Sequence, residues 1–259
     1  MTQRERGLWL IRELLKDMPQ YCDTPIPAHP QRRWQLLRSL MNVRPPIPVT
    51  EEFCRNQDAF LQQMTREKGI VNAEDLPACP KDGRLALWQG DITTLKCDAI
   101  VNAANSQMLG CFSPCHGCID NIIHTMAGVQ LRLACDALMR AQGHEEPTGR
   151  AKITPGFNLP ARFVLHTVGP IIQDDVTPED EALLASCYRS CLELAEENGC
   201  GSIAFCCIST GVFRFPADLA AQIAVRTVKD FLEKDGGIRR VIFNVFKDSD
   251  RAIYQRLLF

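Results

Sequence analysis

The sequence predicts an α/β protein: a three-layer α/β/α sandwich with a mixed, largely parallel sheet, preceded by a helical extension. Two observations predict this fold. From residue 84 onward, short apolar runs typical of buried strands alternate with longer segments of helical periodicity. Such alternation favours a sheet of mostly parallel strands covered by helices on both faces. The first 80 residues instead show helical patterns separated by prolines, so we expect an extension over residues 1–80 and the sandwich over residues 81–259.

The extension is expected to contain three helices. Apolar residues recur at helical spacing over residues 8–18 and again over residues 34–41. Prolines separate these two stretches and follow the second one. Thr50 is suited to cap a third helix, because Glu51 and Glu52 would favour its first turn. The extension holds no constellation typical of catalysis, and we expect it to pack on the main domain.

Five strands and four helices are predicted in the sandwich. The strands are the apolar runs at residues 85–88, 99–101, 162–166, 202–205 and 240–245. The helical patterns lie near residues 120–141, 179–198, 217–234 and 249–258. Ligands commonly bind beyond the carboxyl ends of strands in such sheets, so the residues that follow each strand are the first candidates for function.

Composition excludes several classes of partner. The net charge of -2 gives no electrostatic reason to expect nucleic acid or an anionic membrane surface. No apolar run approaches the roughly 20 residues that span a bilayer. The first residues lack the pattern of a signal peptide, and a cytoplasmic location is therefore expected. The 13 cysteines are expected to be reduced, and most of them lie in apolar or helical runs as small hydrophobic residues.

Residues 110–124 form the most informative segment, because three cysteines, two histidines and an acid crowd into one loop and the start of a helix. Cys111, Cys115, His116 and Cys118 offer the thiolates and imidazole that zinc prefers. Asp120 and His124 follow at helical spacing. Asp120 is therefore a candidate general base beside a metal, or alternatively a cap of the helix that contains His124.

Three further motifs follow predicted strands, and each has a structural alternative. Gly90–Thr93 ends the first strand, where Asp91 could accept a hydrogen bond from a base or cap the next turn. Asn102–Asn105 ends the second strand with two amides, which often satisfy local backbone groups. Residues 208–216 join a strand to a helix through Ser209, Thr210 and Gly211. Such a turn is either a backbone cradle for phosphate or an ordinary connection.

The ordered series Gly-Asp-Ile-Thr, Val-Asn-Ala-Ala-Asn-Ser, Ile-Asp-x-x-Ile-His-x-x-Ala-Gly and Ile-Ser-Thr-Gly-Val-Phe-x-Phe-Pro resembles the macrodomain family, whose members bind ADP-ribose. The resemblance covers roughly residues 84–259. Typical members carry a Gly-rich segment where this chain has Cys-Phe-Ser-Pro-Cys-His-Gly-Cys. That departure is similar to the zinc-containing branch, which resembles hydrolases that remove ADP-ribose from proteins.

The resemblance implies a role for each matching position. Asp91, with the Ile92 backbone nearby, would contact adenine, and Phe246 would cover its face. Asn105 and Asp120 would act at the distal ribose as the catalytic residues. The complete set of implied ADP-ribose-binding residues is Asp91, Ile92, Asn105, Ile119, Asp120, Asn121, Ser209, Thr210, Gly211, Val212, Phe213 and Phe246. Arg214 stands where many relatives have glycine.

The resemblance also implies the metal ligands and the reaction. The constant positions of the family pattern fall on Cys111, His116 and Cys118, which would hold one Zn²⁺ per chain and leave an open position. A closed site that also uses Cys115 is the alternative. The implied substrate is an ADP-ribosylated protein, whose O-glycosidic bond to an acidic side chain would be hydrolysed to release ADP-ribose.

Other functions stay open at this point. The domain could be a non-catalytic reader of ADP-ribose, or it could deacetylate O-acetyl-ADP-ribose. The spacing Cys111-x3-Cys115-x2-Cys118 also occurs in radical enzymes that bind a four-iron cluster. Two features oppose that interpretation: Gly117 stands where those enzymes usually have an aromatic residue, and only about 140 residues follow, against the roughly 250 of a full barrel.

Overall fold

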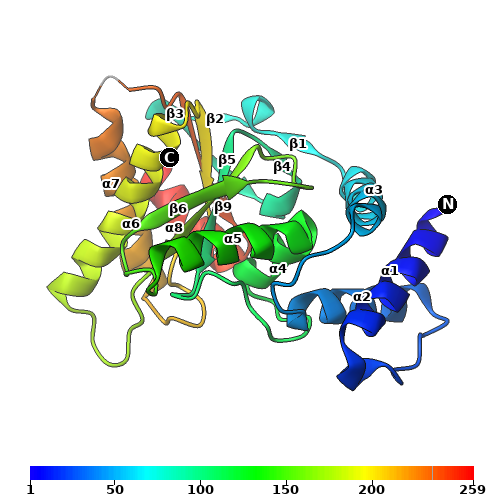
Figure 1. Ribbon diagram of the computed structural model, residues 1–259. Helices are drawn as coiled ribbons and strands as arrows, with labels where there is room; N and C mark the ends of the chain where they lie inside the picture. The colour runs from blue at the N-terminus through cyan, green and yellow to red at the C-terminus, as the bar shows by residue number, and fades with distance from the viewer. Residues whose placement is uncertain (235) are drawn as a thin grey trace.

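The computed structural model describes residues 1–234 and 236–259, and its centre is a seven-stranded sheet with the order β2-β3-β9-β8-β5-β7-β6 (Figure 1). The strands are β2 (Ala78–Cys79), β3 (Asp82–Gln89), β5 (Ala99–Ala104), β6 (Ala151–Pro155), β7 (Phe163–Val168), β8 (Ser202–Phe205) and β9 (Arg240–Val245). The inner pairs are parallel, and β2 and β6 run antiparallel at the two edges. The predicted mixed, largely parallel sheet is confirmed.

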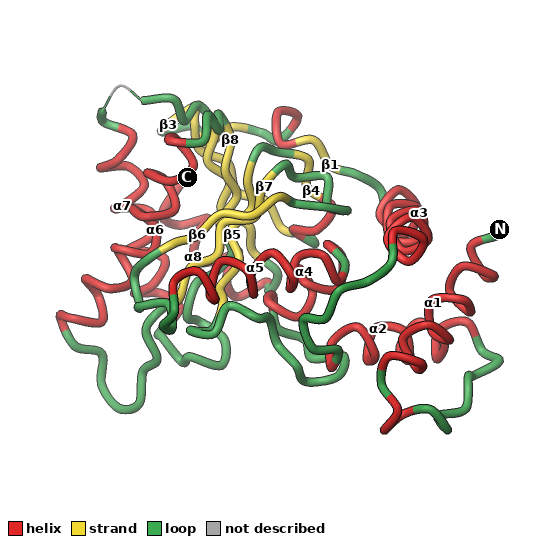
Figure 2. The backbone as a smooth tube through the Cα atoms, in the orientation of Figure 1, coloured by secondary structure: helices red, strands yellow, loops and turns green. Residues whose placement is uncertain are grey.

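Helices cover both faces of this sheet, which gives the predicted three layers (Figure 2). Helices α4 (Ile119–Ala127) and α5 (Val129–Gln142) pack on one face. Helices α6 (Pro178–Glu197), α7 (Ala217–Leu232) and α8 (Asp248–Leu258) pack on the other. Every residue of β8 and β9 is buried, because their side chains meet helices on both faces of the sheet.

The sequence missed some features of the sandwich. The pattern over residues 120–141 is two helices rather than one, because Gly128 adopts a φ of +96° between them. Strand β6 was not predicted, since it is short, contains Lys152 and Pro155, and lies at an edge. Of the cysteines in apolar runs, Cys135, Cys187, Cys191 and Cys206 are buried and Cys207 is only partly buried.

Three helices form the extension: α1 (Gln3–Asp17), α2 (Pro30–Val43) and α3 (Glu51–Lys68). They share a small apolar core of their own and approach the sandwich on the side of α4 (Figure 1). Thr50 caps α3 as predicted, because its side chain accepts from the Phe53 N–H at 3.1 Å. Short 3₁₀ turns lie at Pro19–Tyr21, Ala73–Asp75 and Ile92–Thr94, and β1 (Val71–Asn72) pairs in parallel with β4 (Leu95–Lys96).

Among the helices of the described residues, none combines the length and the apolar character that a bilayer crossing requires.

Candidate functional site

The predicted site residues gather along the edge of the sheet formed by the carboxyl ends of its parallel strands. Strands β3, β9, β8 and β5 all end there. Asp91 follows β3, Phe246 follows β9, Ser209 follows β8 and Asn105 follows β5. These strands are neighbours in the order β3-β9-β8-β5. The predicted adenine, phosphate and ribose contacts therefore lie along this edge in the order of the parts of ADP-ribose.

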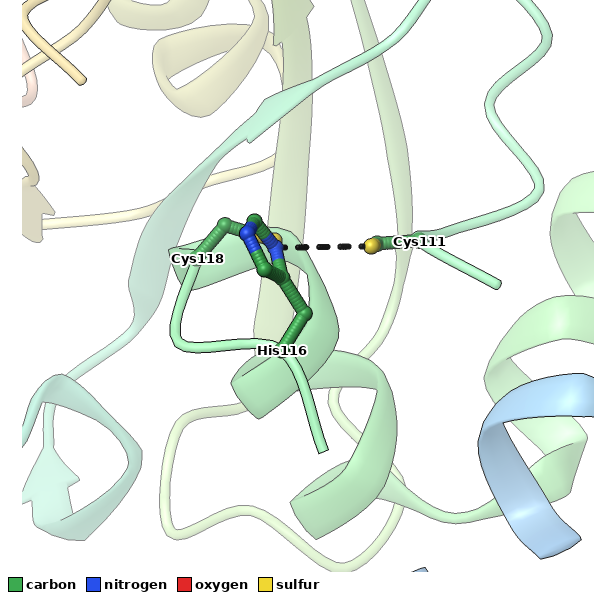
Figure 3. Close-up of side chains that lie close together, drawn as sticks. All are labelled: Cys111, His116 and Cys118. Carbon is green, nitrogen blue, oxygen red and sulfur yellow. Dashed lines mark hydrogen bonds between the residues drawn. The ribbon is translucent and has the colours of Figure 1, made fainter. Parts of the chain in front are cut away.

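Cys111, His116 and Cys118 come together in the loop between β5 and α4 (Figure 3). Their thiol and imidazole atoms all lie within 4.8 Å of one another, and Cys111 Sγ is 3.7 Å from His116 Nδ1. His116 is exposed and the two cysteines are partly buried, so the three groups face accessible space. Two thiols and one imidazole at this separation form a donor set that fits zinc.

Cys115 lies in the same loop, but its thiol points elsewhere. Its Sγ donates to the Gln35 carbonyl at 3.3 Å and lies 3.2 Å from Ser39 Oγ, so it contacts α2. Cys115 has a φ of +53°, a left-handed conformation that is uncommon for residues other than glycine. The conformation turns the thiol away from the other three donors.

Cys118 begins α4 as its N-cap, because its Sγ accepts from the Asn121 N–H at 3.4 Å. The alternative in which Asp120 caps this helix is therefore wrong: Asp120 lies inside the first helical turn. Ile119 is the first residue within the helix. The buried Asn121 side chain donates hydrogen bonds to backbone carbonyls of the preceding loop.

Asp120 is almost fully buried and held from two sides. Its Oδ1 accepts from Asn102 Nδ2 at 2.8 Å, and its Oδ2 lies 3.4 Å from Asn105 Nδ2. Burial raises the pKa of Asp120 to about 6, although the Asn102 hydrogen bond and the charge of Arg132 favour the ionised form. A carboxylate with such a pKa remains ionised at neutral pH and is a stronger proton acceptor than an exposed one.

A buried polar group behind Asp120 was not predicted as part of the site. His124 Nε2 lies 3.5 Å from Asp120 Oδ1. Asn102 Nδ2 is also 3.1 Å from His166 Nδ1, and His166 Nε2 is 2.9 Å from Thr154 Oγ1. Burial lowers the pKa of His166 to about 3 and places that of His124 well below its usual value, so both imidazoles are neutral. A histidine in the middle of an apolar strand was the available signal for His166.

His166, His124 and Cys135 also bring their ring nitrogens and thiol within 4.8 Å of one another. In this group the hydrogen bonds from Asn102 and to Thr154 already use both nitrogens of His166. This buried group is therefore linked to Asp120 through Asn102. It differs from the accessible donor set of Cys111, His116 and Cys118.

Asn105 fixes the turn that follows β5. Its Nδ2 donates to the Gly110 carbonyl at 3.2 Å, and its Oδ1 accepts from the Gln107 N–H at 3.1 Å. Gly110 has a φ of +79°, and a Cβ there would lie 2.8 Å from the His124 ring. Asn105 and Asp120 thus face one another beside the start of the cysteine loop (residues 111–118).

Asp91 performs the capping role that its motif allowed. Its Oδ1 accepts from the Thr93 N–H at 3.0 Å and from Thr93 Oγ1 at 2.6 Å, which caps the turn that begins at Ile92. Its Oδ2 pairs with Lys68 Nζ of α3 at 2.9 Å. Burial opposes ionisation, yet the bonds from Thr93 and Lys68 outweigh it and lower the pKa of Asp91. A base contact by Asp91 stays a prediction.

Phe246 and the loop at residues 208–216 follow the two middle strands, β9 and β8, at the same end of the sheet. Phe246 is 78% exposed, so its ring is accessible to a ligand. Within the loop, the Phe215 N–H donates to the Ser209 carbonyl and the Arg214 N–H donates to the Gly211 carbonyl. The N–H groups of residues 210–213 have no partner within the described residues, and the buried Ser209 Oγ has none either.

These free donors make the loop a candidate anion cradle, as its motif predicted. Ser209 and Arg214 both adopt left-handed φ values, of +64° and +59°. Arg214 thus occupies a conformation that glycine adopts without strain. Val212 is 71% exposed, and Phe213 is held by its carbonyl, which accepts from the Ile172 N–H at 2.9 Å.

Comparison with known proteins identifies relatives over the whole chain. The sequence profile of the Macro domain matches residues 101–224. A protein-ADP-ribose hydrolase from Treponema medium is 57% identical over 260 residues and is covered completely, as is this chain. One from Staphylococcus aureus (strain MSSA476) is 48% identical over 255 residues, which is 98% of this chain and 95% of the relative.

Solved structures of macrodomains are also similar to this chain. The Trypanosoma brucei macrodomain in complex with ADP-ribose is 32% identical with a TM-score of 0.67, over 85% of this chain and 95% of that chain. The Oceanobacillus iheyensis macrodomain with ADP is 42% identical with a TM-score of 0.60, over 66% of this chain and 88% of that chain.

Proposed function

The chain belongs to the macrodomain family, and from that premise we propose that it is a hydrolase that removes mono-ADP-ribose from modified proteins. The bond cleaved is the O-glycosidic bond between the distal ribose and an acidic side chain, with assistance from one zinc ion per chain. One observation carries the proposal: the three-donor loop, the Asn105–Asp120 pair and the free N–H groups of residues 210–213 lie at one edge of the sheet.

Binding would begin with the diphosphate. The unpartnered N–H groups of residues 210–213 donate to its oxygens, and the Ser209 hydroxyl lies beside them. Asp91 and the Ile92 backbone contact adenine, while the exposed Phe246 covers the base. These contacts lie away from the reacting bond, so their binding energy serves to position the distal ribose.

Cys111, His116 and Cys118 would hold the zinc ion, since their donor atoms converge and their chemistry suits it. When bound, zinc would polarise a hydroxyl of the distal ribose or a water molecule and lower its pKa. Asn105 orients the ribose beside this loop. Such orientation matters because a misplacement of about 1 Å can reduce a rate on the order of a hundredfold.

Asp120 positions or deprotonates the attacking water. Asn102 holds one of its oxygens at 2.8 Å, which fixes the direction of the other oxygen towards Asn105 and the ribose position. A small accessible part of the side chain remains, and this is where water would meet the carboxylate. The product is free ADP-ribose and an unmodified carboxyl group on the protein.

The Asp120→Ala variant tests this proposal. Turnover on a protein modified at aspartate or glutamate should fall about a hundredfold or more, the range of general base catalysis. Zinc content and ADP-ribose affinity should survive, because neither the three donors nor the 210–213 loop includes Asp120. Asp136→Ala is the control, since that aspartate lies on α5 and pairs with Arg140.

Three results would contradict the proposal. Unchanged turnover at saturating substrate, with a lowered melting temperature, would make Asp120 a structural residue. Binding of ADP-ribose without release from any modified protein would indicate a reader. Release of acetate from O-acetyl-ADP-ribose, with the protein substrate left intact, would indicate the deacetylase.

A further inference from the structure

Helix α2 of the extension contacts the cysteine loop through side chains on one of its faces, and the proposed function gives that contact no role. Cys115 donates its backbone N–H to Asn42 Oδ1 at 3.0 Å, while Asn42 Nδ2 donates to Thr125 Oγ1 of α4 at 3.0 Å. Asn42 is buried, so it joins the loop and α4 through one fixed side chain. The Cys115 thiol adds its contacts to Gln35 and Ser39 of the same helix.

Arg38 of α2 reaches two of the three donor residues. Its Nη2 donates to the His116 carbonyl at 2.6 Å and to Asn121 Oδ1 at 2.8 Å. Asn121 in turn donates through Nδ2 to the carbonyls of Cys111, at 3.2 Å, and Ser113, at 2.9 Å. One guanidinium therefore sets the position of His116 directly and that of Cys111 through Asn121.

The loop has little internal structure that would do this instead. Between residues 111 and 117 of the described chain, the one backbone hydrogen bond inside the loop runs from the His116 N–H to the Ser113 carbonyl. Cys118 is fixed separately, because it starts α4. Without α2, the His116 carbonyl would lose its bond from Arg38, and Asn121, which holds the Cys111 carbonyl, would lose the group that fixes it.

The helix itself is anchored to the sandwich. Arg132 of α5 donates to the Met41 carbonyl at 3.1 Å and to the Leu109 carbonyl at 2.6 Å, and it also bonds to the Arg44 carbonyl. The end of α2 and the residues just before the cysteine loop thus contact the same guanidinium. Because Arg132 fixes the end of α2, the side chains of this helix can hold the cysteine loop in one position.

We propose that α2 is a positioning element of the metal site, and that Arg38 is its principal positioning residue. This inference rests on the proposed zinc site. Residues that orient metal ligands typically change metal affinity by about 10- to 100-fold when they are removed. Arg38 acts on backbone carbonyls of the loop, so its effect should appear in metal binding before any substrate is present.

The test compares Arg38→Ala with Arg32→Ala, a matched control because Arg32 lies on α2, is exposed and has no partner among the described residues. Zinc dissociation constants are measured by competition with a chromogenic chelator. We expect Arg38→Ala to raise the constant about 10- to 100-fold and Arg32→Ala to leave it unchanged. Melting of the zinc-free proteins, followed in excess chelator, should give similar temperatures.

Arg38→Lys provides a second variant if Arg38→Ala does not fold. The lysine ammonium lies one bond nearer the backbone than Arg38 Nη2, the single nitrogen that makes both bonds, so zinc binding should weaken there too, by a smaller factor. Equal zinc affinity in Arg38→Ala, Arg38→Lys and Arg32→Ala would overturn the inference and leave the proposed function intact. A wild-type protein that hydrolyses its substrate but binds no zinc would instead contradict both.

Discussion

The cysteine loop (residues 111–118) and the phosphate loop (residues 208–216) lie at the same edge of the sheet, but they keep their shapes by different means. The phosphate loop closes mainly on its own backbone, through bonds from Phe215 to Ser209 and from Arg214 to Gly211, with one bond from outside it, from the Ile172 N–H to the Phe213 carbonyl. The cysteine loop depends on partners outside it: Arg38 and Asn42 of α2, and Asn121 of α4.

This difference matters because the two loops serve different chemistry. An anion cradle needs free N–H groups, so its shape must come from few internal bonds and from unusual φ values. A metal loop needs side chains directed at one point, and surrounding residues can provide that direction. The extension also reaches the opposite end of the site, where Lys68 pairs with Asp91.

The largest expected effect separates the ligands of the cysteine loop. Cys118→Ser keeps an oxygen that can cap α4 but removes a thiolate, and His116→Ala removes the imidazole. Both should lose the zinc ion, while Cys115→Ala should retain about one per chain, because the Cys115 thiol contacts α2. Elemental analysis of the purified proteins measures this.

Two outcomes would change this picture of the cysteine loop. Equal metal loss in Cys115→Ala and Cys118→Ser would show a closed site with four ligands. An iron–sulfur absorbance after anaerobic purification would support the radical enzyme instead.

The sequence predicted the phosphate loop better than the surroundings of the cysteine loop. Ser209, Thr210 and Gly211 are adjacent in the chain, so their strand-to-helix position alone offers a turn with free donors as one of two interpretations. Arg38 lies 78 residues before His116, so its contact depends on how α2 docks, which periodicity does not report. His166 was missed for a similar reason: its partners Asn102 and Thr154 belong to other strands.

An intermediate effect is expected at Gly169, which follows β7 and packs against the phosphate loop. A Cβ at Gly169 would lie 2.0 Å from Ser209 Oγ and 2.8 Å from Ile208 Cγ2, so Gly169→Ala should displace the start of the loop. Overpacking of this kind costs about 1–3 kcal/mol. Binding the diphosphate would require the displaced loop to return to its observed shape, so this cost would be taken from the binding free energy. ADP-ribose affinity, measured by calorimetry, should fall about tenfold, since about 1.4 kcal/mol corresponds to a tenfold change.

The zinc content of Gly169→Ala should stay at the wild-type level, because the cysteine loop is held by α2. Gly117→Ala is the control in that loop, where a Cβ meets nothing within 4 Å. Unchanged ADP-ribose affinity in Gly169→Ala would show that the phosphate loop does not need its observed shape.

The smallest effect concerns two left-handed residues, Arg214 of the phosphate loop and Cys115 of the cysteine loop. Left-handed backbone costs a residue with a side chain about 1–2 kcal/mol, and glycine returns about 0.5–1 kcal/mol of that through the greater freedom of the unfolded chain. Arg214→Gly should therefore raise the free energy of unfolding by up to about 1 kcal/mol, because the side chain has one long bond, 3.4 Å, to the Gln173 carbonyl. Cys115→Gly should give no such gain, since it also loses the thiol contacts to Gln35 and Ser39. Urea unfolding of both variants measures the difference, and an equal gain in both would mean that the Cys115 thiol contributes nothing to the shape of the cysteine loop.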